Sequence, residues 1–520
     1  MKRLREFMVS RSQPEIGFTS QVMPEGGPQF LNRRIPEIAA MRHAQQLWVR
    51  SGWAERRKIL RSFRANVAAG AEQIAALMPA TLARNHADTL GAEILPLLDA
   101  CKFLELEAEE ILQPQRLGRH RLPLWLTGVH SEVHRDPLGV ILVIGPSNYP
   151  LMLPGVQTLQ ALAAGNACIW KPAVGCEQVA HAMRQCLLDA GLAPGLLWVT
   201  DSSIAMAQEL LSADVDKVYL TGSVPTGQSV LRQLATSVTP AVMELSGCDA
   251  VFILPGADLA RVTNALLFGT RLNGSATCMA PRRVLVPREM ADDLESRLAF
   301  AFRDVPAVSL NARTRELLAT LVDDAQRKGA RLVFDGRSET HSGVQPLLLA
   351  GADETMLVTR TDIFAPVLAL MPFDNEEQAL QMYAACPFAL SAAIFGLARH
   401  AAALSNRIVA GTVILNDLIA PTIDPRISFG GRRASGYGVT RGREGLLEMT
   451  APKVIIAQRA MHRLHYEKTT SDHFDLFAGI VHGVHGKGWR NRSRGWMRAL
   501  SAGLRIGKRP TRTQADNEKP

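Results

Sequence analysis

One cysteine, one glutamate and one asparagine stand where their side chains could carry out chemistry. Cys278 lies in NGSATCMAPRR, among small and polar residues, so bulky neighbours need not cover a sulfur that could act as a nucleophile. Glu244 lies between Met243 and Leu245, and apolar neighbours raise the pKa of a carboxylate toward the range of a general base. Asn148 follows the apolar run GVILVIG, in a loop where α/β sheets present groups to ligands.

The other cysteines and the histidine pairs indicate neither a disulfide framework nor a metal site. The chain has seven cysteines; they are scattered and none forms a CxxC pair, so we expect reduced thiols. Taken alone, any one of them is interpreted as a small buried apolar side chain. The pairs in HSEVH (His130, His134) and HGVH (His482, His485) have no third ligand at a sensible spacing, so no metal is predicted.

The composition is that of a soluble protein with more than one domain. A chain of 520 residues is too long for one simple core, and 47% apolar with 21% charged residues is ordinary for a globular protein. No apolar run reaches the roughly 18 residues of a transmembrane helix. The N-terminal MKRLREFMVS is basic without the apolar core of a signal peptide. We therefore expect a cytoplasmic location.

The basic charge is concentrated near the C-terminus. Residues 487–512 hold nine Lys or Arg and no acid, which equals the net charge of +9 of the whole chain. On a helix, Trp489, Trp496, Leu500 and Leu504 fall within a sector of roughly 80°, and the basic residues on the opposite side are Arg490, Arg494, Arg498, Arg505 and Lys508. This pattern predicts peripheral contact with an anionic membrane surface. The alternatives are a helix docked on the body and a disordered tail; nucleic acid is not expected.

Strand-like and helical segments alternate through most of the chain. Residues from about 36 to 115 have helical periodicity, and LTGVHSEVHRDPLGV then resembles two short strands with Asp136-Pro137 as a turn. Apolar runs such as GVILVIG and NACIWKP alternate with helical stretches, and a second series begins with RRVLVP after Cys278. This alternation predicts parallel sheets covered by helices on both faces, the doubly wound α/β class.

Six motifs, taken in order along the chain, carry a family resemblance. They are IGPSNYP with ALAAGNACIWKPA, LTGSVPTG, MELSG, FGTRLNGSATCMAPRR, TDIFAPVLALMPF, and AGTVILN followed by ISFGGRRASGYG. With these motifs the chain resembles the aldehyde dehydrogenase superfamily over roughly residues 35–455. The resemblance implies an α/β fold with a Rossmann-like cofactor domain, a second α/β catalytic domain and a small bridging element for oligomerisation.

The resemblance also implies a role for each of the three side chains. Cys278 matches the nucleophile, whose thiolate adds to the aldehyde; the adduct loses hydride to a nicotinamide, and the thioester that remains is open to water. Asn148 matches the oxyanion donor, acting with the backbone N–H of Cys278. Glu244 matches the general base. The alternatives are an asparagine that satisfies its own turn and an exposed glutamate at a strand end.

The cofactor site is expected at the loops of the first domain, although no GxGxxG is present. Gly222 and Ser223 lie at a strand-to-helix turn, where a hydroxyl and backbone N–H groups can hold pyrophosphate. The resemblance implies that Lys171 contacts the adenosine ribose, and that Asp362 and Phe364 hold the nicotinamide ribose and pack near the ring. The complete predicted set is Gly145, Pro146, Ser147, Lys171, Gly222, Ser223, Gly227, Asp362 and Phe364.

Several positions depart from the family pattern. Val174 stands where an acid often accepts the ribose hydroxyls of NAD, and without that carboxylate NADP also fits, so both cofactors stay open. Asp362 is one methylene shorter than the usual Glu at the nicotinamide ribose. Around the nucleophile and the base, the departures are Ser275 and Ala276 for a Gly-Gln pair, Ser246 for a Gly and Cys248 for a common Lys.

The resemblance implies an aldehyde dehydrogenase that oxidises an aldehyde to a carboxylic acid with NAD(P)⁺. A homodimer or homotetramer is expected by analogy, and a membrane-facing tail favours an apolar aldehyde. The predicted parts are a flexible arm at 1–30, the cofactor domain at 31–246 with oligomerisation strands at 121–137, the catalytic domain at 247–448, an oligomerisation strand at 449–460 and the basic amphipathic tail at 461–520.

Two other functions compete with this one. In a CoA-acylating aldehyde dehydrogenase, CoA rather than water takes the acyl group; the presence of Glu244 argues against it. In a catalytically weak scaffold, a dehydrogenase body is held at a membrane by the tail, and the departures around Cys278 motivate this alternative.

Overall fold

The computed structural model describes residues 35–507, apart from 83, 124, 125, 127, 338–342, 460–463 and 467. The arm predicted at 1–30 lies outside the described residues. The chain divides into two compact units: unit 1 comprises Met1–Pro114 and His134–Lys453, and unit 2 comprises Gln115–Val133 and Val454–Pro520. Both α/β sheets belong to unit 1, so the predicted division of the chain at residue 246 stays a prediction.

The N-terminal part of unit 1 is helical, as its periodicity predicts. Its helices are α1 (Pro36–Arg50), α2 (Gly52–Ala69), α3 (Ala71–Ala76), α4 (His86–Thr89) and α5 (Leu95–Leu112). A single π-helical turn, η3 (Leu90–Ile94), joins α4 to α5; such turns often occur at functional sites. Helix α2 packs against α5 and α7 (Glu177–Asp189), where Phe63 and Leu97 are fully buried.

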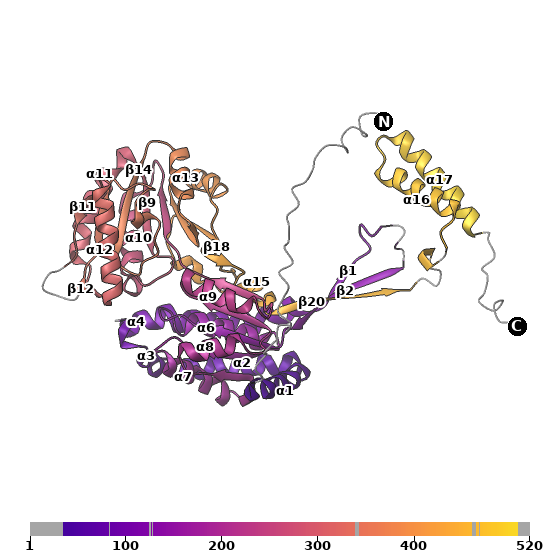
Figure 1. Ribbon diagram of the computed structural model, residues 1–520, viewed down its shortest axis with the longest axis horizontal. Coiled ribbons are helices and arrows are strands. Elements are labelled where there is room, and N and C mark those ends of the chain that lie inside the picture. Colours follow the sequence, from indigo (N-terminus) through magenta and orange to yellow (C-terminus); the bar gives the residue numbers. More distant parts are fainter. Residues whose placement is uncertain are drawn as a thin grey trace, which may run out of the picture. The chain divides into compact units, whose positions relative to one another are not determined.

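A six-stranded sheet forms the first α/β layer of unit 1 (Figure 1). Its strand order is β19 (Gly436–Tyr437), β7 (Ala241–Glu244), β6 (Lys217–Thr221), β3 (Val140–Ile144), β4 (Ala167–Lys171) and β5 (Leu197–Val199), all parallel except β19. The intervening helices are α6 (Met152–Ala163), α7, α8 (Ile204–Leu211) and α9 (Val224–Leu234). The chain runs from β3 to β5 and then returns to place β6 beside β3, so the order reverses between these two strands. Doubly wound sheets bind ligands at this switch point.

A seven-stranded sheet forms the second layer. Its order is β11 (Arg331–Phe334), β13 (Leu347–Ala350), β14 (Val367–Phe373), β9 (Pro281–Pro287), β8 (Asp249–Ile253), β16 (Ser391–Phe395) and β17 (Thr412–Leu415). Successive residues of β8 point to opposite faces: Ala250 and Phe252 lie in one apolar cluster, and Val251 and Ile253 in another. Both faces of the sheet are therefore buried.

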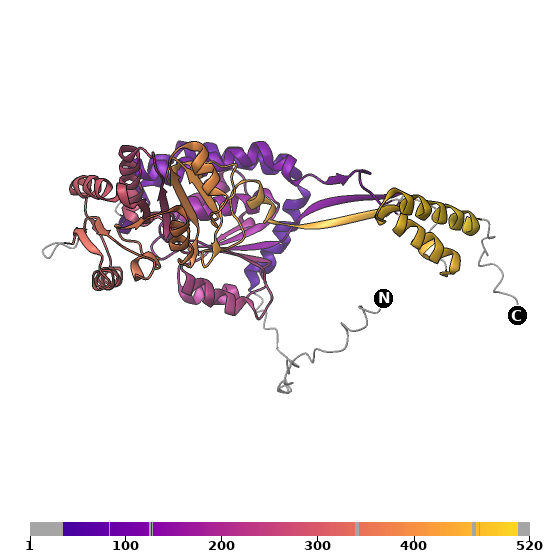
Figure 2. The same ribbon diagram turned by 90° about the horizontal axis from the view of Figure 1, so that it is seen from above.

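Helices cover the sheets of unit 1 (Figures 1 and 2). Those of the second layer are α10 (Leu259–Arg271), α11 (Arg288–Ala301), α12 (Ala312–Arg327), α13 (Glu376–Ala384) and α14 (Ala398–Ser405), and α15 (Gly442–Leu447) follows β19. Two small strand pairs complete the unit, β10 (Val308–Ser309) with β12 (Gly343–Val344) and β15 (Phe388–Ala389) with β18 (Arg432–Arg433). The doubly wound α/β class is confirmed.

A three-stranded sheet has the order β1 (Gln115–Leu117), β2 (Val129–Pro137) and β20 (Thr450–Gln458). The turn predicted at Asp136-Pro137 is wrong. These two residues end the single strand β2, and the break before β3 falls at Leu138 and Gly139. Gly139 has a φ of 132°, where glycine is favoured, so the chain turns two residues later than the Asp-Pro pair suggests.

The C-terminal part of unit 2 contains two helices, α16 (Ser471–His485) and α17 (Trp489–Gly507), that pack along each other. The predicted amphipathic helix is present as α17. It packs against α16, and none of the predicted arrangements of the tail included this pairing. Lys508 and the residues up to 512 lie outside the described part. Glycines let the two backbones touch: a Cβ on Gly495 would lie 2.4 Å from the amide nitrogen of Gly483, and one on Gly479 would lie 2.4 Å from that of Ala499.

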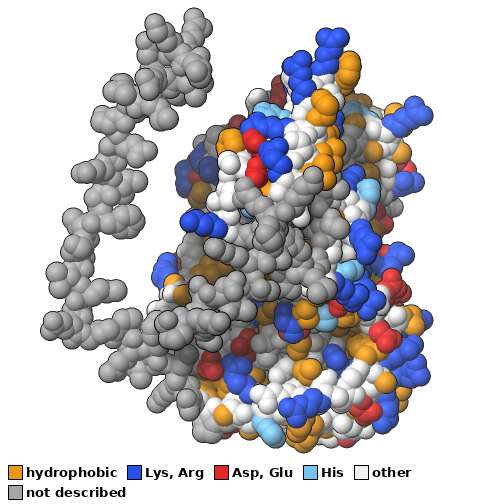
Figure 3. Space-filling model, turned by 90° about the vertical axis from the view of Figure 1, so that its right-hand side faces the viewer, with side chains coloured by type: hydrophobic (Ala, Val, Ile, Leu, Met, Phe, Trp, Pro, Cys, Tyr) orange, Lys and Arg blue, Asp and Glu red, His pale blue; other side chains and the backbone are white. Residues whose placement is uncertain are grey.

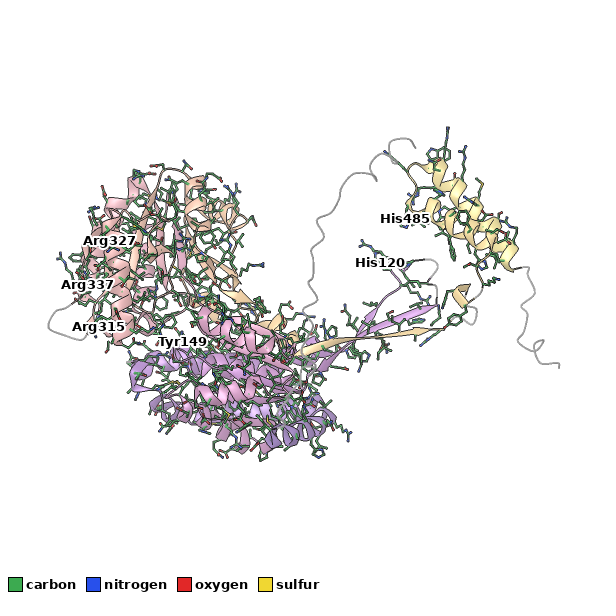
Figure 4. The ribbon with its side chains drawn as sticks, in the orientation of Figure 1. His120, Tyr149, Arg315, Arg327, Arg337 and His485 are labelled. Carbon is green, nitrogen blue, oxygen red and sulfur yellow. The ribbon has the colours of Figure 1, made fainter. Side chains whose placement is uncertain are left out.

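Two further structural findings concern membranes and metals. None of the helices in the described part of the chain combines the length and the apolar character needed to cross a bilayer. Within the same residues, no three His, Cys, Asp or Glu side chains gather as a metal site. His482 and His485 are exposed on α16, and Figure 4 labels His485 on this helix.

Candidate active site

Cys278 lies in a turn that joins η6 (Leu272–Ser275) to β9. Three successive residues of η6, Asn273, Gly274 and Ser275, have φ angles of 53°, 58° and 64°. This left-handed region costs a non-glycine residue of the order of 1–3 kcal/mol, so other contacts must hold the turn. Cys278 follows it, half-buried, three residues beyond Ser275.

Ser275, which replaces the glycine of the family pattern, supplies some of these contacts. Its side chain is fully buried, and its hydroxyl donates to the carbonyl oxygen of Ala365 at 3.2 Å. The buried Arg282 donates to the Ser275 hydroxyl at 2.8 Å and to the Ser275 carbonyl oxygen at 2.7 Å. The substitution therefore adds a bonded hydroxyl to the turn of residues 273–278, which is called the nucleophile turn after the predicted role of Cys278.

Asn148 lies in the loop of residues 145–151 between β3 and α6, buried against the same turn; this loop is called the oxyanion loop after the predicted role of Asn148. Its side-chain NH₂ donates to the carbonyl oxygen of Ala276 at 2.9 Å, and its side-chain oxygen accepts from the N–H of Tyr149 at 3.1 Å. An amide NH₂ has two hydrogens. One hydrogen therefore fixes the amide on the nucleophile turn, and the second is a further donor with which the amide can bind a ligand.

Glu244 is the last residue of β7 and is 3% exposed. Neither carboxylate oxygen makes a hydrogen bond of good geometry among the described residues. Burial raises the pKa of Glu244 to about 7, and the nearby Arg441 guanidinium and Thr221 hydroxyl lower it by less. The carboxylate can therefore gain and lose a proton near neutral pH.

The loop that follows Glu244 lies against the nucleophile turn. A Cβ on Gly247 would stand 2.4 Å from the carbonyl oxygen of Cys278, so only glycine fits at this position. The pKa of the Cys278 thiol is raised well above its ordinary range, first by burial and then by the charges of Glu244, Asp249 and Asp362. The thiol is thus protonated near neutral pH, and it needs a base before it can attack a carbonyl.

Arg441 is a buried charge at the site that sequence reasoning missed. It has a φ of 62°, and its NH1 group donates to the carbonyl oxygen of Thr422 at 2.8 Å. Its Nε has no partner among the described residues, and its positive charge lowers the pKa of both Glu244 and Cys278. The motif ISFGGRRASGYG ends three residues before Arg441. Arg441 therefore lies outside the motifs from which the site residues were predicted.

A cavity of about 690 Å³ opens beside the oxyanion loop. Its wall contains Asn148 and Ala276, together with the predicted cofactor residues Ser147 and Phe364. Apolar side chains make up much of the remainder: Leu82, Phe268, Leu272, Val305, Val308 and Leu310. The cavity thus joins residues from both α/β layers of unit 1 next to the nucleophile turn.

Five of the predicted cofactor residues lie at the switch point of the six-stranded sheet. Gly145, Pro146 and Ser147 follow β3, while Gly222 and Ser223 follow the adjacent β6. Ser223 is the N-cap of α9, where its hydroxyl accepts from the N–H of Thr226. The predicted residue Gly227 is buried within α9, and a Cβ there would lie 2.8 Å from Leu245. Its small size lets α9 approach the loop that follows Glu244.

The remaining predicted cofactor residues lie on two segments. Lys171 is the last residue of β4 and is 8% exposed. Burial lowers the pKa of Lys171, and the negative charges of Asp201 and Glu177 raise it by less. Val174, which stands where the family often has an acidic residue, is 77% exposed. Asp362 and Phe364 lie in the loop before β14, and burial raises the pKa of Asp362.

The comparisons with known proteins agree with this geometry. The sequence model described as "Aldehyde dehydrogenase family" matches residues 35–455. The chain belongs to this family. It is therefore an NAD(P)-dependent oxidoreductase that oxidises aldehydes to carboxylic acids.

Relatives of this aldehyde dehydrogenase differ in their substrates. It is 27% identical to 4,4'-diapolycopene aldehyde oxidase of Methylomonas sp, covering 87% of each chain. It is 32% identical to vanillin dehydrogenase of Pseudomonas fluorescens, covering 65% of this chain and 73% of that protein. It is 30% identical to betaine aldehyde dehydrogenase of Cereibacter sphaeroides, covering 80% of this chain and 88% of that protein.

Solved structures of the family share the fold. The aldehyde dehydrogenase of Mycobacterium tuberculosis in complex with NAD⁺ is 26% identical, with a TM-score of 0.74 over 80% of this chain and 88% of that one. The NADP-dependent glyceraldehyde-3-phosphate dehydrogenase of Bacillus halodurans in complex with NADP is also 26% identical. Its TM-score is 0.75 over 82% of this chain and 90% of that one.

The residues at the switch point of this aldehyde dehydrogenase fit a dinucleotide. The N-terminus of α9 offers backbone N–H groups and the Ser223 hydroxyl to a pyrophosphate. Lys171 reaches the same edge of the sheet, since β4 lies beside β3. The donor set therefore has the chemistry that the cofactor requires.

Proposed function

We propose that Cys278, Asn148 and Glu244 are the nucleophile, the oxyanion donor and the general base of this aldehyde dehydrogenase. The observation that carries the proposal is the buried Glu244 carboxylate, which has a pKa of about 7 and no hydrogen-bond partner among the described residues. The contact between Gly247 and Cys278 holds its loop against the nucleophile turn. Such a carboxylate is suited to accept protons at this position.

In the first half-reaction, Glu244 takes the proton of the Cys278 thiol and the sulfur adds to the aldehyde carbon. The carbonyl oxygen becomes an oxyanion, which the Asn148 NH₂ and the backbone N–H of Cys278 stabilise; a donor of this kind is worth about 3–4 kcal/mol of barrier. Oxidised nicotinamide, when bound, supplies the acceptor for the hydride. Loss of hydride from the carbon leaves a thioester on Cys278.

In the second half-reaction, Glu244 releases its first proton to solvent and acts again as a base. It removes a proton from water as the water oxygen bonds to the thioester carbon. The bond from carbon to sulfur breaks, the carboxylic acid leaves, and Cys278 recovers a proton. A pKa of about 7 allows one carboxylate to serve both steps.

For the cofactor, we propose that Ser223 and the loops after β3 and β6 hold the pyrophosphate, and that Lys171 contacts the adenosine ribose. Asp362 and Phe364 hold and pack the nicotinamide half. The exposed Val174 places no carboxylate at the ribose, which is compatible with both NAD and NADP.

The proposal is tested by following NAD(P)H formation and the acyl adduct by mass spectrometry. We expect Cys278→Ser to abolish oxidation and Glu244→Gln to accumulate a thioester. Cys186→Ser is the matched control, because Cys186 is also half-buried but lies on α7; it should keep wild-type turnover. Full turnover by Cys278→Ser would refute the assignment. Product that appears only with CoA would favour the CoA-acylating reaction, and no NAD(P)H with any aldehyde would favour a scaffold.

We also propose that the substrate is an apolar aldehyde taken from a membrane surface by the α16–α17 hairpin. The exposed apolar residues are Phe474, Phe477, Val481 and Val484 on α16, and Trp489, Met497, Leu500 and Leu504 on α17. On each helix they lie on average roughly 160° around the axis from the glycines at the contact, in the same rotational sense. Because the helices run antiparallel, both apolar faces point away from the partner helix and tilt toward the same side of the hairpin.

Charges distinguish the other side of the hairpin. Arg498 pairs with Asp475 at 2.7 Å, and Arg505 pairs with Asp472 at 2.8 Å, across the two helices. Figure 3 shows one face of the molecule, on which hydrophobic and basic side chains lie next to one another. An apolar face bordered by Lys and Arg fits a layer of anionic lipids. The relative named for an aldehyde of diapolycopene supports a substrate of this kind.

Assembly into a homodimer or homotetramer is proposed through strand β20. It is one of the two edge strands of its sheet, and Val454, Ile455 and Ile456 are exposed along it. An exposed apolar edge strand pairs readily with another chain. A monomer in analytical ultracentrifugation would contradict this proposal.

A further inference from the structure

A buried ion pair lies behind the oxyanion loop. Arg84 and Glu93 are 2.9 Å apart, and their side chains are 1% and 0% exposed. Arg84 precedes α4, and Glu93 lies in the π-helical turn η3. Burying two charges costs several kcal/mol per ion, so a pair of this kind is weak evidence for stability by itself. Its other contacts suggest a different use.

Glu93 binds the start of α6, the helix that follows Asn148. One oxygen of its carboxylate pairs with Arg84, and the other accepts from the backbone N–H groups of Leu151 at 3.2 Å and Met152 at 2.7 Å. Leu151, at the N-cap, has no capping side chain of its own. Glu93 therefore satisfies these free donors and fixes where α6 begins.

Arg84 connects the oxyanion loop to the nucleophile turn. Its NH2 group donates to the backbone oxygen of Asn148 at 2.6 Å and to the side-chain oxygen of Asn273 at 2.7 Å. The side-chain NH₂ of Asn273 in turn donates to the same Asn148 oxygen at 2.8 Å and to that of Ala276 at 3.2 Å. The strained residue Asn273 is thus held by the ion pair.

A second contact between the two segments runs through Tyr149. Its hydroxyl is 2.7 Å from that of Thr277, the residue before Cys278, and the Arg84 guanidinium lies 5.0 Å from its ring centre. Figure 4 labels Tyr149 where the two α/β layers of unit 1 meet. Arg84 therefore contacts both residues of the oxyanion loop that touch the nucleophile turn.

We propose that Arg84 and Glu93 are positioning residues that align the Asn148 amide with the Cys278 backbone N–H and so set the geometry of the oxyanion hole. This inference rests on the proposed oxyanion role of Asn148. The fork of the Arg84 guanidinium binds the two loops together, while Glu93 supplies the matching charge and anchors α6. A shift of about 1 Å in such a site can cost 100-fold in rate.

A double-mutant cycle on hydride transfer tests the inference. The single-turnover rate is measured for the full-length chain, Asn148→Ala, Arg84→Met and the double variant. We expect Asn148→Ala to lower the rate about 100–1,000-fold and Arg84→Met to lower it about 10–100-fold. If Arg84 acts through Asn148, the double variant should be within about threefold of Asn148→Ala alone.

Arg84→Lys separates positioning from folding. Lysine keeps a charge beside Glu93 but lacks the guanidinium fork. We therefore expect a melting temperature close to that of wild type, an unchanged Kd for the cofactor and a rate lowered about tenfold, an effect of the order seen when positioning is lost. Arg64→Lys is the matched control, because Arg64 forms a similar forked pair with Glu105, at 2.6 and 3.0 Å, on α2 and α5; its rate should stay that of wild type.

The outcomes distinguish the possible failures. Losses that multiply in the double variant, or a wild-type rate for both Arg84 variants, would overturn the positioning role. A wild-type rate for Asn148→Ala would instead remove the proposed oxyanion donor, and the inference with it. A rate loss in Arg84→Lys that returns to wild type under conditions that restore its melting temperature would show a merely structural role.

Discussion

Gly247 and the carbonyl oxygen of Cys278 are in backbone contact, and a Cβ on Gly247 would lie 2.4 Å from that oxygen. Gly247 lies three residues after Glu244, and Cys278 lies three residues before the start of β9. The contact thus holds the loop that follows Glu244 against the turn that carries Cys278. It explains why a glycine stands here although neither of its neighbours, Ser246 and Cys248, matches the family pattern.

We expect Gly247→Ala to lower turnover about 100-fold, because the added methyl group must push the nucleophile turn away by roughly an ångström. Gly70→Ala is the control, since a Cβ on Gly70 meets only ordinary contacts, at 3.5 Å and beyond. Steady-state kinetics and thermal denaturation of both variants check the prediction. Near-normal turnover in Gly247→Ala would mean that the loop yields without disturbing the chemistry.

The deacylation rate should rise with pH and reach half its maximum near pH 7. Glu244 must be deprotonated to accept a proton from water, and burial places its pKa at about 7. Stopped-flow measurement of thioester hydrolysis from pH 5.5 to 8.5 would show this midpoint. In Glu244→Gln the rate should be low and flat with pH; an unchanged profile would assign the titration to another group.

Arg441→Met should move the same midpoint to higher pH. The Arg441 charge lowers the pKa of Glu244, so its removal lets burial raise that pKa further. The exposed Arg426, which pairs with Asp424, is a suitable control, and Arg426→Met should leave the midpoint unchanged. A midpoint that falls in Arg441→Met would contradict the sign of this effect.

Ser275→Ala should destabilise the protein by ~1–3 kcal/mol, because the buried Arg282 loses a partner for its NH1 group. Ser275→Gly loses the same hydroxyl, but glycine adopts the φ of 64° without strain and should recover about 1 kcal/mol. Denaturant unfolding of both variants measures the difference. Equal stability of the two variants would show that the left-handed backbone costs nothing here.

Val174→Glu should raise the KM for NADP about tenfold and leave the KM for NAD unchanged or lower, because the new carboxylate repels the 2′-phosphate with roughly the strength of one charge contact. Val174 is exposed, so the side chain has room. Val174→Gln, which has the same size without the charge, should change neither value. Equal effects of Val174→Glu on both cofactors would place the adenosine ribose elsewhere.

Leu504→Asp should weaken binding to vesicles that contain anionic phosphatidylserine about tenfold, since it puts a charge on the apolar side of the hairpin. Ser501→Asp adds the same charge to the basic side of α17 and should weaken binding less. Co-sedimentation of the full-length chain, with neutral vesicles for comparison, measures both. Equal binding by Leu504→Asp and wild type would remove the membrane proposal, and a change in oligomeric state instead would indicate a second hairpin as the partner.

The class of fold and the identity of the candidate reactive residues follow from the sequence alone. Alternating strand and helix patterns depend on neighbouring residues, and they predict the doubly wound class that the structure confirms. The motifs place Asn148, Glu244 and Cys278 in that order along the chain. The misplaced turn at Asp136-Pro137 shows the limit of such patterns, since the glycine beyond it decides where the chain bends.

Only the tertiary structure decides how these residues are held. Arg84 and Asn273 are 189 residues apart, yet they bond in one buried network, and Arg441 tunes Glu244 from beyond the last motif. The pairing of α17 with α16 likewise turns a single amphipathic helix into a two-sided hairpin. Local sequence patterns determine which side chains are available, whereas burial and charge depend on which distant segments meet, and these contacts set the pKa values and the alignment of the site.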